Sequence, residues 1–202
     1  MEYFWRPLAG FKKNIGRLIF EFETLEFENF DKLLEALVPE IERQLLLPSI
    51  FLGHSMGALL AFEVMRALPM EHQKNIRGVA LSSFIPPTLE NLNARQKITN
   101  LPEEQFLSAI AHYAEIPQQI LADPDAKSFF LSLLRKDILL LESYQFHPTP
   151  VGNTPLLILG GKQDRKIPIE ALEKWLDFGY PVKKILTLPG SHFYILTEHT
   201  SV

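Results

Sequence analysis

One serine in this sequence has neighbours that would suit a nucleophile. The segment Gly53-His54-Ser55-Met56-Gly57 fits the pattern G-x-S-x-G and lies between a short apolar run and an apolar helical run. A turn this sharp between a strand and a helix brings neighbouring side chains into collision, so we expect the residues two positions before and two positions after the serine to be small. The turn would present the Ser55 hydroxyl to solvent. The amide of Met56, at the start of the helix, is the expected oxyanion-hole donor.

A nucleophilic serine needs a general base, and the base needs an acid that orients it. After a strand–turn–helix nucleophile, the acid and the histidine follow in that order, each on a loop after a later strand. Asp164 follows the apolar run at 154–160, and His192 follows the run at 182–188. The stretch between them has room for one helix and one strand. The sequence therefore predicts a Ser55–Asp164–His192 catalytic triad.

The other histidines and aspartates fit these roles less well. An aspartate in a turn is usually a cap or a turn former, and a lone histidine is usually structural, so the order of two residues on two loops favours Asp164 and His192. His54 adjoins the serine, but neighbouring positions of a sharp turn point in different directions, and we interpret it as a lining or packing residue. The remaining candidates lie on predicted helices or in polar surroundings: His72, His112, His147, His199, Asp137 and Asp177.

Strands and helices must alternate to position these residues, and the sequence shows that alternation. Short apolar runs predict strands at 16–23, 48–53, 76–83, 154–160 and 182–188, and helical spacing predicts helices at 28–45, 55–68 and 169–178. This order indicates an α/β fold with a mainly parallel sheet and helices on both faces. The chain has no repeat or linker, so we expect residues 1–202 to form one domain.

The alternation stops between about residues 86 and 147. Two amphipathic helical segments lie there, at 103–116 and 126–144. A helical insertion between two strands suggests a cap over the strand ends, where open α/β sheets place their sites. The alternative is an ordinary crossover with extra helices, but the length of the segment favours a cap.

The composition excludes several classes of protein. The chain has 202 residues and a formal net charge of -4, whereas nucleic-acid-binding domains usually carry a basic excess. No apolar run approaches the roughly 20 residues that cross a bilayer, and the N-terminus does not fit a signal peptide. The sequence has no cysteine, which excludes disulfides, thiolate metal sites and a cysteine nucleophile. We therefore expect a cytoplasmic protein that binds neither nucleic acid nor membrane.

Four segments together resemble the type II thioesterases of the α/β-hydrolase superfamily. They are GHSMGALLAFEV at 53–64, LLRKDILLLESY at 133–144, LGGKQDRKIPIEALEKW at 159–175 and LPGSHFYIL at 188–196. The resemblance extends from about residue 4 to residue 196. Type II thioesterases are stand-alone enzymes of nonribosomal peptide and polyketide synthesis, and relatives release medium-chain fatty acids from fatty acid synthase.

The resemblance implies hydrolysis of acyl thioesters on the phosphopantetheine arm of an acyl or peptidyl carrier protein, for editing or chain release. It assigns Ser55 as nucleophile, Asp164 as orienting acid and His192 as general base, and it requires no metal or diffusible cofactor. A carrier is generally acidic, so an acidic enzyme needs a local basic docking patch. Lys127, Arg135 and Lys136, or Lys12 and Lys13, could contribute to it, although solvated surface charge is the more common role of such residues. Apolar cap residues such as Phe106, Ile110 and Phe129 would shape the acyl chamber, or simply pack the cap.

The start of the chain departs from the family pattern. The family usually begins with an apolar strand and a loop that supplies the second oxyanion amide, and we expect this strand to be missing here. The PLAG segment at 7–10 is an alternative candidate for the loop, although too few residues follow it for a parallel crossover helix. Two other functions therefore stay open: a small-molecule carboxylesterase with the same triad, and an acyl- or carrier-binding module with low or no activity.

Overall fold

The computed structural model describes residues 27–93, 97–111, 118–148 and 151–197. Its strands are β1 (Ser49–His54), β2 (Ile76–Ser82), β3 (Leu156–Gly161) and β4 (Val182–Leu188). Its helices are α1 (Phe30–Gln44), α2 (Met56–Ala67), α3 (Met70–Gln73), α4 (Leu89–Asn93), α5 (Glu103–Ala111), α6 (Gln118–Ala122), α7 (Pro124–Ser143), α8 (Ile169–Glu173), the 3-10 helix η2 (Lys174–Asp177) and α9 (Tyr194–Thr197). These bounds closely match the predicted elements, except that the predicted helix at 169–178 divides into α8 and η2. The predicted strand at 16–23 lies outside the described residues.

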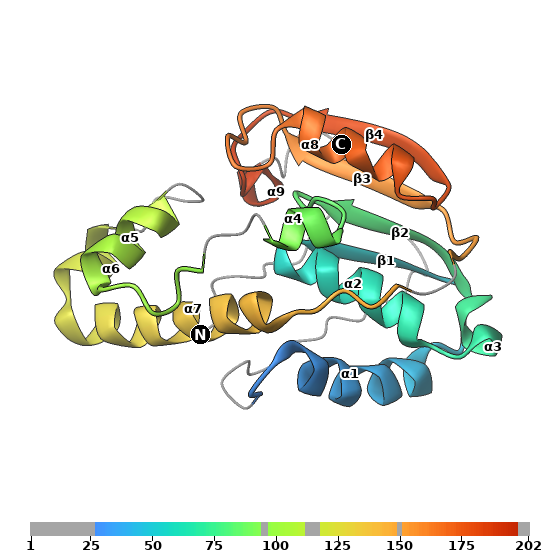
Figure 1. The fold of residues 1–202 in the computed structure, drawn as a ribbon, viewed down its shortest axis with the longest axis horizontal. Helices are drawn as coiled ribbons and strands as arrows, with labels where there is room; N and C mark the ends of the chain where they lie inside the picture. Colours follow the sequence, from blue (N-terminus) through green and yellow to red (C-terminus); the bar gives the residue numbers. More distant parts are fainter. Residues whose placement is uncertain (1–26, 94–96, 112–117, 149–150, 198–202) are drawn as a thin grey trace.

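The four strands form one parallel sheet in the order β1-β2-β3-β4 (Figure 1). This confirms the predicted α/β fold with a parallel sheet. Because parallel strands point the same way, their carboxyl ends share one edge of the sheet, and the segments that follow them emerge there. The segments after β1, β3 and β4 carry Ser55, Asp164 and His192.

Local signals in the sequence determine where α1 begins and which side it buries. The side chain of Asn29 accepts a hydrogen bond from the amide of Lys32 at 3.0 Å, which caps the first turn. Phe30, Leu33 and Leu37 follow at helical spacing and are buried. The apolar face of α1 therefore packs on α2 and on the end of α7.

The main core lies on one face of the sheet. Helix α2 packs on β1 and β2, and α8 packs on β3 and β4. Phe62 of α2 and Trp175 of η2 meet edge to face with ring centroids 5.2 Å apart, so both helices cover the same face. On the opposite face Ile50 and Leu52 of β1 are 72% and 53% exposed. The sequence predicted helices on both faces of the sheet. In the described part of the chain, α1, α2 and α8 lie on one face, and the single-turn helix α9 lies on the other.

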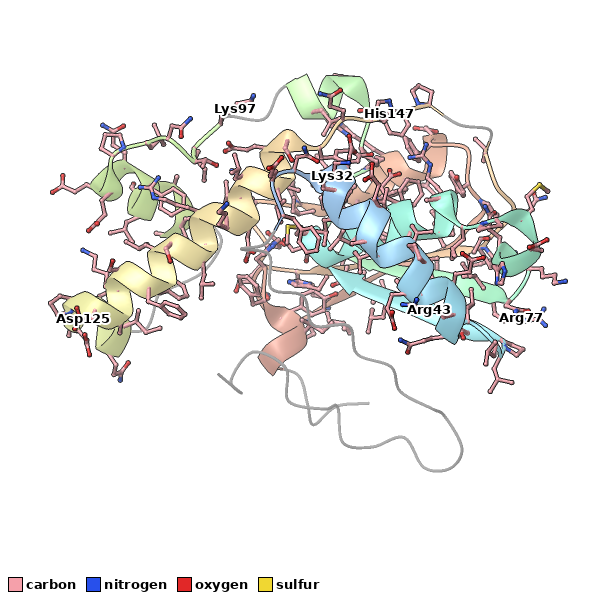
Figure 2. All side chains as sticks on the ribbon, turned by 90° about the horizontal axis from the view of Figure 1, so that it is seen from below. Lys32, Arg43, Arg77, Lys97, Asp125 and His147 are labelled. Atoms are coloured by element: carbon pink, nitrogen blue, oxygen red, sulfur yellow. The ribbon has the colours of Figure 1, made fainter. Side chains whose placement is uncertain are left out.

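Helices α4 to α7 fill the segment between β2 and β3, as the cap prediction requires. Helices α5 and α6 and the first half of α7 extend away from the sheet (Figure 1). Asp125, at the start of α7, lies at the far end of the molecule from Arg43 and Arg77 (Figure 2). This extension has a small core of its own, formed by Ile98, Phe106, Ile110 and Leu131. No helix within the described ranges is long and apolar enough to cross a membrane.

Two cap residues expected to face a ligand or partner are instead used inside the cap. Phe106 is fully buried in the cap core, so the alternative role of packing is the correct one for it. Arg135 donates hydrogen bonds to the carbonyls of Thr99 and Leu101, and its guanidinium lies 4.0 Å from the centroid of the Phe106 ring. Arg135 thus joins the cap's elements and is not a residue of an open docking patch.

A buried polar cluster joins the end of the cap to α2. The Tyr144 hydroxyl donates to Glu63 Oε1 at 2.6 Å, and Arg66 donates to Glu63 Oε2 at 2.8 Å and to the carbonyl of His147. The Glu63 carboxylate is buried, so each of these hydrogen bonds replaces one with water. The Tyr144 ring also packs edge to face on Phe30, with centroids 4.8 Å apart. Helix α7 is therefore anchored to the body at its carboxyl end.

We expect Tyr144→Phe to lower the free energy of unfolding by about 1–3 kcal/mol, because it removes a donor from a buried carboxylate while keeping the ring. The measurement is urea unfolding at neutral pH. Glu35→Gln, which removes one partner of the exposed Lys32–Glu35 pair, is the control and should leave the midpoint unchanged. Equal effects of the two substitutions would show that the buried cluster does not stabilise the fold.

Candidate active site

Ser55 occupies a strained turn between β1 and α2. Its φ of 53° and ψ of -120° lie outside the regions that L-residues normally adopt. Its amide donates to the carbonyl of Ser82 at 2.8 Å, and its carbonyl accepts from the amide of Ala58 at 2.9 Å. The backbone on both sides of the serine is therefore held by the sheet and by the helix, which gives the side chain a defined direction.

The two glycines of the turn are not equivalent. A Cβ atom at Gly53 would lie 2.0 Å from the carbonyl oxygen of Gly57, a distance that no side chain can tolerate. A Cβ atom at Gly57 would meet no atom of the described residues within 4 Å. The expected collision therefore applies to a side chain at Gly53, whereas Gly57 enters the close approach only through its backbone.

Ser55, His192 and Asp164 form a continuous line of hydrogen-bond distances. His192 Nε2 lies 3.1 Å from Ser55 Oγ, and His192 Nδ1 lies 2.8 Å from Asp164 Oδ2. The histidine and the aspartate are 3% and 5% exposed. The fold thus brings together the three residues that the sequence singled out, from three separate loops at the carboxyl edge of the sheet.

Asp164 is held in place by its own loop. Its Oδ1 accepts hydrogen bonds from the amides of Lys166 at 3.0 Å and Ile167 at 2.9 Å, while Oδ2 faces His192. Burial alone raises the pKa of Asp164, but the hydrogen bonds from His192, Ile167 and Lys166 outweigh burial, so its pKa lies below the ordinary value. An ionised Asp164 places the His192 proton on Nδ1 and leaves Nε2 as the acceptor that faces Ser55.

Close backbone contacts position the loop that carries His192. A Cβ atom at Gly161, the last residue of β3, would lie 2.3 Å from the carbonyl oxygen of Ser191. The side chain of Gln163 accepts a hydrogen bond from the amide of Gly190. The glycine at the end of β3 therefore lets the histidine loop lie directly against the loop that carries Asp164.

The amide of Met56 is available beside the serine. In the first turn of α2, the amides of Ala58 and Leu59 donate to the carbonyl of Ser55. No group of the described residues accepts a hydrogen bond from the amide of Met56, as is usual for the first amides of a helix. The segment 7–10, the alternative candidate for the loop that supplies a second oxyanion amide, lies outside the described residues.

His54 points to the face of the sheet opposite α2. Its Nδ1 lies 2.9 Å from Ser82 Oγ, and its ring centroid is 5.3 Å from that of His192. Burial, and to a smaller extent the charge of His192, lower the pKa of His54 to about 4 against the opposing effect of Asp164. A ring that stays neutral and faces Ser82 is not placed to take a proton from Ser55, which agrees with the interpretation of His54 as a packing residue.

Sequence reasoning missed three polar residues around the triad. Ser82 is opposite His54 in the β1–β2 register and is fully buried, and its hydroxyl lies 2.7 Å from that of Tyr194. Ser83 has a positive φ of 50° and donates from Oγ to the carbonyl of His192 at 3.5 Å. The signal was the pair of serines at the end of a strand predicted to be buried, where polar groups need partners.

The other candidate residues lie apart from this line. His147 is exposed, and His72 Nε2 lies 3.2 Å from Glu42 Oε1 on the surface. His112 and His199 fall outside the described residues. The described residues contain no group of three or more histidine, aspartate or glutamate side chains that could hold a metal ion.

Comparisons with known proteins agree with this geometry. The thioesterase domain family matches residues 17–202. The chain is 30% identical over 167 residues to the gramicidin S biosynthesis protein GrsT of Aneurinibacillus migulanus, covering 83% of this chain and 64% of that protein. It is 25% identical over 205 residues to the probable anguibactin biosynthesis thioesterase AngT of Vibrio anguillarum, covering 96% of this chain and 80% of that protein.

A solved structure is also similar. The type II thioesterase YbtT, from the yersiniabactin nonribosomal peptide and polyketide pathway, superposes with a TM-score of 0.70 and 26% identity. The superposition covers 84% of this chain and 69% of that chain. The chain thus spans somewhat less than two thirds of the length of GrsT and somewhat more than two thirds of the length of YbtT.

The glycine contacts lead to a stability prediction. We expect Gly53→Ala to lower the free energy of unfolding by about 3 kcal/mol or more, because its methyl group would overlap the backbone of Gly57. Gly57→Ala should leave stability unchanged or raise it by up to about 1 kcal/mol, because alanine favours a helix. Urea unfolding followed by the fluorescence of the buried Trp175 measures both. A smaller loss for Gly53→Ala than for Gly57→Ala would contradict the geometry of the turn.

The low pKa of His54 makes stability depend on pH. The unfolded chain takes up this proton near pH 6.5 and the folded protein near pH 4, so the stability is complete above pH 6.5 and declines as the pH falls toward 4. Between pH 7.5 and pH 5 the wild type should lose about 2 kcal/mol more than His54→Asn, which cannot titrate. His147→Asn, at an exposed histidine, is the control. Parallel losses for wild type and His54→Asn would refute the burial effect.

Proposed function

The chain belongs to the thioesterase domain family, and we propose that it is a serine hydrolase that cleaves acyl thioesters from the phosphopantetheine arm of a carrier protein. The observation that carries this proposal is the line from Ser55 through His192 to Asp164 at 3.1 and 2.8 Å. Nucleophile, base and orienting acid stand in the order that acyl transfer requires. The names of GrsT, AngT and YbtT support a place in nonribosomal peptide or polyketide synthesis.

The proposed cycle has two half-reactions. Ser55 Oγ attacks the thioester carbonyl carbon while His192 Nε2 takes its proton, and the negative charge on Asp164 stabilises the imidazolium. The amide of Met56 donates a hydrogen bond to the oxyanion. The carbon–sulfur bond then breaks, the carrier thiol leaves with the proton from His192, and the acyl group stays on Ser55. His192 next removes a proton from water, which attacks the carbonyl carbon of the acyl-serine ester. The bond from this carbon to Ser55 Oγ then breaks, Oγ takes the proton back from His192, and the acid is released.

The same proposal covers the setting of the reaction. We place residues 1–202 in a single domain, with the cap at about 86–147 next to the triad. The reacting groups are side chains and a backbone amide of the protein, so the mechanism uses no metal and no bound cofactor. The phosphopantetheine arrives on the acyl or peptidyl carrier protein, which is the proposed partner, and the reaction takes place in the cytoplasm.

The decisive test is hydrolysis of an acyl-phosphopantetheinyl carrier protein, followed by mass spectrometry of the carrier. We expect Ser55→Ala to reduce kcat at least about 1,000-fold, because the nucleophile is lost while the fold is kept. Asp164→Asn should also lower kcat strongly with little effect on KM, because it disturbs the His192 tautomer. His147→Asn, at an exposed histidine outside the triad, serves as the control.

The alternatives predict different results in the same assay. A carboxylesterase would cleave a short oxygen ester with a much higher kcat/KM than the acyl carrier thioester. A binding module would retain the acyl carrier without turnover, although the wild type is folded. Equal turnover by wild type and Ser55→Ala would rule out Ser55 as the nucleophile.

A further inference from the structure

A second line of polar contacts runs behind the catalytic residues. The β1–β2 register places His54 directly beside Ser82, and His54 Nδ1 lies 2.9 Å from Ser82 Oγ. Ser82 Oγ in turn lies 2.7 Å from the hydroxyl of Tyr194. His54 immediately precedes Ser55, and Tyr194 follows His192 by two residues. The contacts therefore bridge the segment that carries the nucleophile and the segment that carries the base.

The histidine loop also packs around the His54 ring. The centroid of that ring lies 5.3 Å from the ring of His192, 5.4 Å from that of Phe193 and 6.2 Å from that of Tyr194. Ser82 and Tyr194 are 0% and 1% exposed. Water therefore does not reach the contact between Ser82 and Tyr194, and this hydrogen bond is stronger than one at the surface, while the contact between His54 and Ser82 is partly buried.

The surroundings of His54 determine which atom donates and which accepts in the hydrogen bonds between His54, Ser82 and Tyr194. His54 Nε2 is buried and has no hydrogen-bond partner among the described residues. A proton on Nε2 would be a buried donor without an acceptor, so a neutral ring keeps its single proton on Nδ1. His54 Nδ1 then donates to Ser82 Oγ, and Ser82 donates to the Tyr194 oxygen.

A positive charge on His54 would oppose the transfer of the Ser55 proton to His192. The titratable groups that face His54 are His192, Asp164 and Tyr194. His192 becomes positively charged when it takes the proton of Ser55, and a second positive ring 5.3 Å away would oppose that step. A neutral His54 supports the loop from behind without this repulsion.

We propose that His54, Ser82 and Tyr194 are positioning residues that hold the His192 loop within hydrogen-bond distance of Ser55. This inference rests on the proposed function, because it assigns to the line a role in activating that serine. None of the three needs to touch the substrate. A displacement of reacting groups by about 1 Å can cost on the order of 100-fold in rate, so the line acts on kcat and not on KM.

The test compares variants that break the line with one that restores it. His54→Leu and Tyr194→Phe remove one hydrogen-bonding group each and keep most of the volume. Each should lower kcat about 10- to 100-fold with KM within about twofold. His54→Asn should retain most of the activity, because its side-chain amide nitrogen can take the place of Nδ1. The double variant His54→Leu/Tyr194→Phe should be no slower than the worse single variant, since one break disables the whole line.

A second measurement separates this inference from the proposed substrate. A fluorophosphonate probe reacts with an activated serine and needs no carrier protein, so its labelling rate at Ser55 reports how well His192 is placed. The labelling rate should fall with kcat in His54→Leu and Tyr194→Phe, and Ser82→Ala provides the same test if His54→Leu does not fold. Tyr180→Phe is the matched control, because Tyr180 is a buried tyrosine that precedes β4, at the opposite edge of the sheet.

The outcomes of these experiments distinguish a positioning role of the three residues from simple packing. Slower labelling in the broken variants, with recovery in His54→Asn, supports the positioning role even if acyl carrier proteins prove not to be substrates. Unchanged labelling in folded His54→Leu and Tyr194→Phe overturns it. Additive losses in the double variant, or an equal loss in His54→Asn, also overturn it, because they would mean that each side chain only packs.

Discussion

Ser55 has a φ of 53°, in a region that costs an L-residue about 1–3 kcal/mol, and the site depends on the contacts that keep it there. Hydrogen bonds to Ser82 and from Ala58 hold its backbone, and the missing side chain at Gly53 lets the strand and the helix meet. The same turn directs the hydroxyl toward His192 and leaves the Met56 amide beside it. The positions of the proposed nucleophile and of the proposed oxyanion donor therefore both result from one backbone conformation.

The parallel sheet completes the site because it brings distant segments to one edge. Asp164 lies on the loop after β3 and His192 on the loop after β4, and neighbouring strands place the two side chains 2.8 Å apart. Burial raises the pKa of Asp164, but the hydrogen bonds from His192, Ile167 and Lys166 outweigh burial and hold this pKa below its ordinary value. The aspartate can then orient the imidazole, so the electrostatics of the site depend on the loop that surrounds a single carboxylate.

The cap and the body are stabilised in different ways. The cap has its own small core around Phe106, with Arg135 binding the carbonyls of its loop. The buried Glu63 cluster anchors the last turn of α7 to α2, next to the chain that follows toward β3. The cap is therefore attached to the body through the last turn of α7 and has separate internal packing.

Local patterns in the sequence determined the strands, the main helices and the three residues of the proposed triad. Alternation and helical spacing report which side of an element is buried, and a serine between glycines, with an aspartate and a histidine after later strands, leaves few other arrangements. The predicted strand at 16–23 stays a prediction, and the alternative oxyanion loop at 7–10 stays untested, because both lie outside the described residues. Only the tertiary structure decided three other features. They are the different space available at Gly53 and Gly57, the hydrogen bonds of Arg135 inside the cap, and the contacts of His54. His54 meets Ser82, and Ser82 meets Tyr194, across 28 and 112 residues of chain. Such pairs depend on strand register and on how loops pack, and no local pattern of residue types encodes either.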